Sequence, residues 1–85
     1  MTMERQDVVR LIEEALVELG HVEYGEVDEE LSLDALIVDA EDRLYLISVL
    51  NLAYFICPYS YIHSANVFRF HLVRDMVNEV MYRQS

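Results

Sequence analysis

The sequence predicts an all-α fold, a bundle of three main helices plus one short helix within a single domain over residues 1–85. Apolar residues recur at helical spacing in three long stretches, which indicates three helices that bury one side. Two glycines and one proline are too few for the many turns of an all-β fold. Of the 85 residues, 54% are hydrophobic, enough for a small core without disulfides or metal ions.

The first helix is expected from Glu4 to Leu19. Glutamates line one side of this stretch, and Gly20 suits the position just past the end of a helix, where a positive φ is common. The inward side is expected to consist of the apolar residues at helical spacing, namely Val8, Leu11, Ile12, Ala15, Leu16 and Leu19.

An acidic connection follows over residues 21–38. It contains apolar residues that a fully solvated loop would not need, so Val27, Leu33 and Leu36 are expected to hold it on the core. A short helical turn is expected near Ser32–Leu36.

The central helix is expected between Asp39, which suits an N-cap, and Pro58, which ends it. Its apolar run, residues 44–57, is too short to span a membrane and contains Ser48 and Asn51, so no membrane span is expected. The predicted core side consists of Leu46, Val49, Leu50, Ala53 and Tyr54, with Ile47 at its edge. The predicted outward side consists of Glu41, Leu44, Tyr45, Ser48, Asn51, Leu52 and Phe55.

The end of the chain predicts two more elements. One helical turn is expected within Tyr59–Ala65, and Asn66 suits the N-cap of a final helix from Val67 to Arg83. The inward stripe of that helix is expected to be Leu72, Val73, Met76, Val77 and Val80.

Charge is distributed very unevenly along the chain. Residues 1–42 hold 14 acids and two arginines, whereas residues 43–85 hold two acids and four arginines. Because an acidic surface repels phosphates, no nucleic acid or membrane is expected as a partner, and a protein with a basic surface would suit. The acids could equally serve only to keep an apolar domain in solution. A single cysteine and the absence of a visible signal peptide fit the cytoplasm.

Motifs for chemistry are lacking, so no enzyme activity is expected. His21, His63, His71 and Cys57 follow no metal-ligand spacing, and no metal is expected. Lysine is absent, which excludes Schiff-base chemistry, and no glycine-rich phosphate loop occurs.

The order of helix, long loop, central helix, short turn and final helix resembles the acyl carrier protein family. Leu19-Gly20 ends the first helix as in many carriers. Leu33-Asp34-Ala35-Leu36 followed by Asp39 is similar to the loop that leads into the family's Asp-Ser-Leu motif, and Cys57-Pro58 stands where Ile-Pro is common. The resemblance covers nearly the whole chain and implies a four-helix carrier bundle.

The chain departs from the family at the attachment site. Where carriers have Asp-Ser-Leu, with phosphopantetheine on the serine, this sequence has Asp39-Ala40-Glu41. Alanine has no hydroxyl, so no phosphodiester can form at residue 40. The expected function is therefore that of a degenerate carrier without a cofactor, which binds protein partners in a biosynthetic system.

The partner-binding residues are expected on the outward side of the central helix, at Leu44, Tyr45, Ser48, Leu52 and Phe55. Two alternatives stay open. Ser32, in Ser32-Leu33-Asp34, could carry phosphopantetheine in a functional carrier. Otherwise the chain could be a homodimeric structural or regulatory bundle, with itself as partner.

Overall fold

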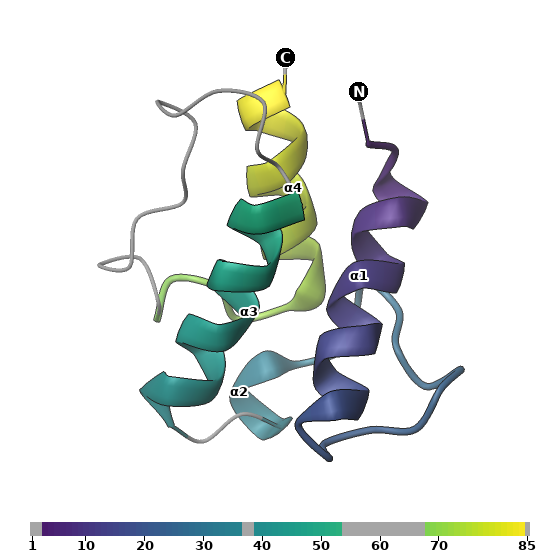
Figure 1. The fold of residues 1–85 in the computed structure, drawn as a ribbon, viewed down its shortest axis with the longest axis vertical. Helices are drawn as coiled ribbons and strands as arrows, with labels where there is room; N and C mark the ends of the chain where they lie inside the picture. The colour runs from purple at the N-terminus through teal and green to yellow at the C-terminus, as the bar shows by residue number, and fades with distance from the viewer. Residues whose placement is uncertain (1–2, 37–38, 54–67, 85) are drawn as a thin grey trace.

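A computed structural model describes residues 3–36, 39–53 and 68–84, and these residues form four helices without a strand. The helices are α1 (Arg5–Glu18), α2 (Leu33–Leu36), α3 (Ala40–Ala53) and α4 (Val73–Gln84) (Figure 1). The all-α class is confirmed, and the helical turn expected near Ser32–Leu36 is α2. The short helix of the predicted bundle is expected as its third helix, after the central one. The helical turn expected at 59–65, the cap at Asn66 and the end of the central helix at 54–58 lie outside the described residues.

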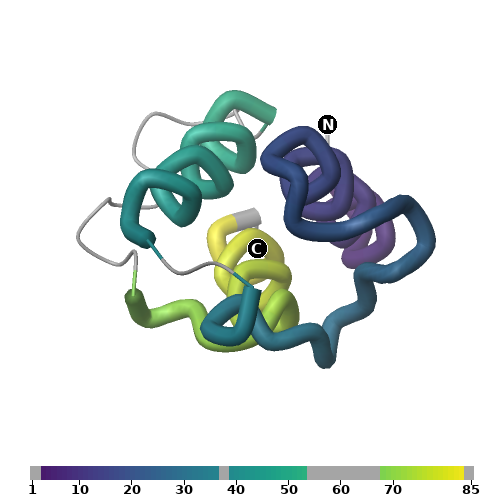
Figure 2. Tube along the Cα trace, turned by 90° about the horizontal axis from the view of Figure 1, so that it is seen from below, coloured from purple at the N-terminus to yellow at the C-terminus, as the bar shows by residue number. Residues whose placement is uncertain are grey.

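The three main helices lie side by side, with α1 antiparallel to α3 and α4 (Figure 1). α1 packs against both of the other main helices. Seen along the bundle, the three helices form a triangle, and α2 lies near the end where α3 and α4 begin (Figure 2). α1 begins and α4 ends at the opposite end of the bundle (Figure 1).

The ends of α1 are fixed by local hydrogen bonds. Glu4 and Asp7 form a capping box, which satisfies free amides of the first turn. At the other end Gly20 adopts a φ of 82°, and the His21 amide donates to the Leu16 carbonyl at 3.0 Å. This is the glycine-terminated helix end that the sequence predicts.

The core fills the space between the three main helices and extends under the acidic connection. Val27 and Leu36 pack partly buried against it, and Leu33 is fully buried, as predicted. Ala53 is exposed, so its expected core position is wrong: the side of α3 that it shares with Val49 is only half-buried one turn earlier. The buried apolar residues are Val8, Val9, Ile12, Ala15, Leu16, Leu33, Leu46, Ile47, Leu50, Phe70, Val73, Met76, Val77 and Val80.

The start of α4 differs from the prediction. Residues 68–72 are not helical, and the helix begins at Val73 rather than Val67. The reason is a tertiary contact: the Leu33 amide donates to the His71 carbonyl at 2.8 Å, and the Val73 amide donates to the Leu31 carbonyl at 3.0 Å. This antiparallel bridge at Ser32 and Leu72 keeps residues 71 and 72 extended.

No helix among the described residues is long and apolar enough to cross a membrane.

Candidate functional site

The residues that the sequence singles out around position 40 form the first turn of α3. A carboxylate oxygen of Asp39 accepts the Asp42 amide at 3.0 Å, which confirms Asp39 as the N-cap. Ala40, half-buried, is the first residue of the helix, and Glu41 beside it is exposed. This turn presents a methyl group where covalent attachment through a phosphodiester would need a hydroxyl.

Ser32 has a structural partner. Its hydroxyl accepts the Ala35 amide at 3.2 Å, as an N-cap of α2 does, and the residue is half-buried. Its backbone lies in the bridge with Leu72. Ser32 thus lies in the contact between α2 and the segment before α4.

The outward side of α3 carries two exposed aliphatic residues. Leu44 is 38% exposed and Leu52 is 74% exposed, with the exposed Ser48 between them. Tyr45 is half-buried, and its hydroxyl donates to a Glu18 carboxylate oxygen at 2.5 Å. That hydrogen bond raises the pKa of the Tyr45 phenol. Four of the five predicted binding residues therefore lie together, and Phe55 lies outside the described residues.

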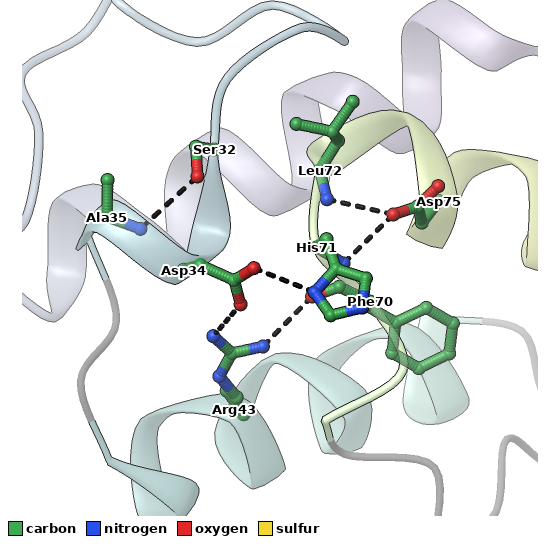
Figure 3. Close-up of polar contacts among 8 residues, drawn as sticks. All are labelled: Ser32, Asp34, Ala35, Arg43, Phe70, His71, Leu72 and Asp75. Atoms are coloured by element: carbon green, nitrogen blue, oxygen red, sulfur yellow. Dashed lines mark hydrogen bonds and ion pairs between the residues drawn. The ribbon is translucent and has the colours of Figure 1, made fainter.

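The sequence prediction missed a buried charge in the first turn of α3. Arg43 is only 3% exposed, and its guanidinium donates to an Asp34 carboxylate oxygen at 2.6 Å and to the Phe70 carbonyl at 2.9 Å (Figure 3). The other Asp34 oxygen lies 2.7 Å from His71 Nδ1. The guanidinium carbon also lies 5.4 Å from the centre of the Phe68 ring, within range of a cation–π contact.

A signal for Arg43 did exist in the spacing of the helix. Arg43, Leu46, Ile47 and Leu50 follow the i, i+3, i+4, i+7 pattern of a single helix side, so position 43 faces the core. Residue type alone predicts the opposite, because arginines are mostly exposed in folded proteins.

The chemistry of this cluster is that of a cross-link between segments. Hydrogen bonds from Arg43 and from His71 hold the pKa of the Asp34 carboxyl below its usual range. Within the described part of the chain, no hydroxyl or thiol forms a hydrogen bond with His71. A second pair, His21 Nε2 and an Asp42 oxygen at 2.7 Å, joins the end of α1 to the first turn of α3.

A cavity of about 320 Å³ lies beside α4 and shares Phe70 with the Arg43 cluster. Its polar groups already have partners: Asp75 accepts the His71 and Leu72 amides, Glu79 accepts from Arg83, and Asn78 accepts from Arg5. The described residues also contain no group of three His, Cys, Asp or Glu placed to hold a metal ion. The lining residues are Arg69, Phe70, Asp75, Asn78, Glu79 and Tyr82.

No protein-family model matches the chain, and neither curated proteins nor solved structures include a significant match.

Proposed function

We propose that this protein is a carrier-like bundle that holds no phosphopantetheine and serves as a protein-binding module, as a subunit or adaptor of a biosynthetic system. The observation that carries the proposal is the first turn of α3, where Asp39 caps the helix and Ala40 begins it without a hydroxyl. A carrier reaction needs a thiol at the end of an attached arm, and this turn offers no atom for the attachment.

The outward side of α3 supports the binding role. Leu44 and Leu52 are exposed on a helix whose other side is buried in the core. Burying leucine side chains at an interface removes apolar surface from water, which stabilises the complex by about 25 cal/mol for each Å² buried. The outward side of α3 is apolar, and the first turn of the same helix cannot carry phosphopantetheine. Together these features favour binding of a protein partner over acyl-group transfer.

Co-expression with a promiscuous phosphopantetheinyl transferase, followed by intact mass spectrometry, tests the proposal. We expect the wild-type chain to keep its unmodified mass. A gain equal to one phosphopantetheine group would contradict the proposal and support a functional carrier. If Ser32→Ala abolished such a gain, Ser32 would be the attachment site.

A matched variant tests the carrier-like part of the proposal separately. Ala40→Ser combined with Glu41→Leu places a hydroxyl directly after the cap and restores the family's motif. We expect this double variant to gain the mass of one phosphopantetheine group. If it folds and stays unmodified, the first turn of α3 is not a carrier site and the likeness to carriers loses its main support.

A further inference from the structure

We infer that α1 and α3 together bind an amphipathic helix of a partner protein, one with aliphatic side chains on one side and lysines or arginines along its flank. This inference rests on the proposed function and names the chemistry of the partner. Its two parts are the α3 stripe, defined as Leu44, Ser48 and Leu52, and the α1 row, defined as Asp7, Leu11, Glu14 and Glu18.

The α3 stripe supplies the apolar contact. Its members are spaced four residues apart, so they lie on one side of the helix over about 12 Å. The exposed fraction rises from 38% at Leu44 to 74% at Leu52. Leucines at this spacing on a helix are the anchors that a second helix packs against.

The α1 row supplies charge along the same surface. The hydrogen bond from Tyr45 to Glu18 shows that Glu18 lies on the side of α1 next to α3. Residues 4, 7 and 11 positions earlier in an α-helix lie within about 40° of the same direction, and these are Glu14, Leu11 and Asp7. All three acids are exposed, and Leu11 is half-buried. Glu14 makes no hydrogen bond or ion pair with any described residue.

Of the protein's six arginines, four pair with acids elsewhere in the fold, and Arg10 is exposed on α1, one turn before Glu14. Arg5 pairs with Glu29, Arg74 with Glu30, Arg83 with Glu79, and Arg43 with Asp34. The exposed Glu41 adds a further acid beside Leu44 at the start of α3. A partner flanked by lysine or arginine would complement these acids, whereas a second copy of this chain would bring the same acids to the interface.

A nuclear magnetic resonance titration of the full chain tests the inference. The probe is a capped helical peptide of leucine and lysine with its leucines on one side, and its matched control replaces every lysine with glutamate. We expect shifts at the amides of the α3 stripe and the α1 row with the lysine peptide, and none with the control. Binding should weaken as salt is added, because the flanking charges are exposed.

Three variants separate the contributions of the two parts. The double variant Leu44→Ser with Leu52→Ser should weaken binding about tenfold or more, because each substitution removes an aliphatic side chain that the peptide would bury. Glu14→Gln with Glu18→Gln should weaken it at low salt and flatten its salt dependence. Tyr82→Ser removes an aromatic that is 77% exposed on α4 and should leave binding unchanged.

Several outcomes would overturn the inference. One is that the lysine peptide does not bind, or binds no more tightly than its glutamate control. Another is that the amide shifts centre on α4, or that the leucine variants bind the lysine peptide as tightly as the wild type. Sedimentation that shows a dimer broken by Leu52→Asp would assign the surface to a second copy instead. None of these results bears on whether phosphopantetheine is attached, so failure here is distinguishable from failure of the proposed function.

Discussion

At the scale of single residues, one guanidinium joins three segments that are distant in sequence. Arg43 on α3 contacts Asp34 on α2 and the Phe70 carbonyl before α4 (Figure 3). A buried charge is costly unless it is paired, and here a carboxylate and a carbonyl accept hydrogen bonds from the two terminal nitrogens of the guanidinium. Arg43 therefore fixes the position of the first turn of α3 relative to the rest of the bundle.

Arg43→Ala should lower the free energy of unfolding by about 2 kcal/mol. The loss is smaller than for a fully buried pair, because the Asp34 side chain is 51% exposed and water can solvate it. Urea denaturation followed by circular dichroism measures it. Arg10→Ala, at an exposed position of α1, is the control and should change stability by less than about 0.5 kcal/mol. Equal effects of the two substitutions would contradict the assigned role.

The Asp34 carboxyl predicts a dependence of stability on pH. Its pKa in the folded state lies below the ordinary value of 3.8, because Arg43 and His71 donate hydrogen bonds to the carboxylate. The resulting stability is present above the unfolded pKa and is lost as pH falls through the folded pKa. Glu29, beside Arg5, has a pKa lowered in the same sense.

Unfolding midpoints measured from pH 6 down to about pH 2 should therefore fall for the wild type, and Asp34→Asn should reduce that fall. The remaining slope in the variant belongs to Glu29 and other carboxylates. A pH profile of Asp34→Asn parallel to that of the wild type would show that Asp34 is not stabilised as a carboxylate.

At the scale of elements, the sequence predicts best where the signal is local. Gly20 after a run of apolar residues at helical spacing indicates the end of α1, and Asp39 indicates the start of α3, because caps act within one turn. The start of α4 is set by a contact with residues about 40 positions earlier, the bridge between Ser32 and Leu72. No local pattern at Asn66 or Val67 contains that information. The spacing of α3 places Arg43 on the core side of the helix, but the acceptors for its guanidinium come from α2 and the segment before α4, which that spacing does not predict.

Gly20→Ala should destabilise the protein by about 1 kcal/mol, because Gly20 has a φ of 82°, which a side chain disfavours. No atom lies within 4 Å of the added carbon, so the cost comes from the backbone alone. Gly20→Asn should cost less, since asparagine tolerates this conformation. Thermal unfolding compares the two, and a cost for alanine no greater than for asparagine would refute the explanation.

At the scale of the whole molecule, the bundle depends on a small core. A chain of this length is stable by roughly 4–13 kcal/mol, so one core side chain matters. Met76 on α4 is fully buried and belongs to the core cluster. Met76→Ala should therefore cost about 3 kcal/mol.

Met81→Ala is the control for this prediction, because Met81 is only partly buried against the same core. We expect a loss of about 1 kcal/mol there. Denaturant unfolding of both variants gives the comparison. A smaller loss for Met76→Ala than for Met81→Ala would mean that α4 does not pack as the structure shows.

The proposed function depends on the first turn of α3, where an alanine follows the capping aspartate. The most direct test is the intact mass of the protein purified from the cells that naturally express it. We predict that the measured mass equals that of the unmodified polypeptide, without a prosthetic group. A population carrying phosphopantetheine on any residue would contradict the account, whatever the variants show.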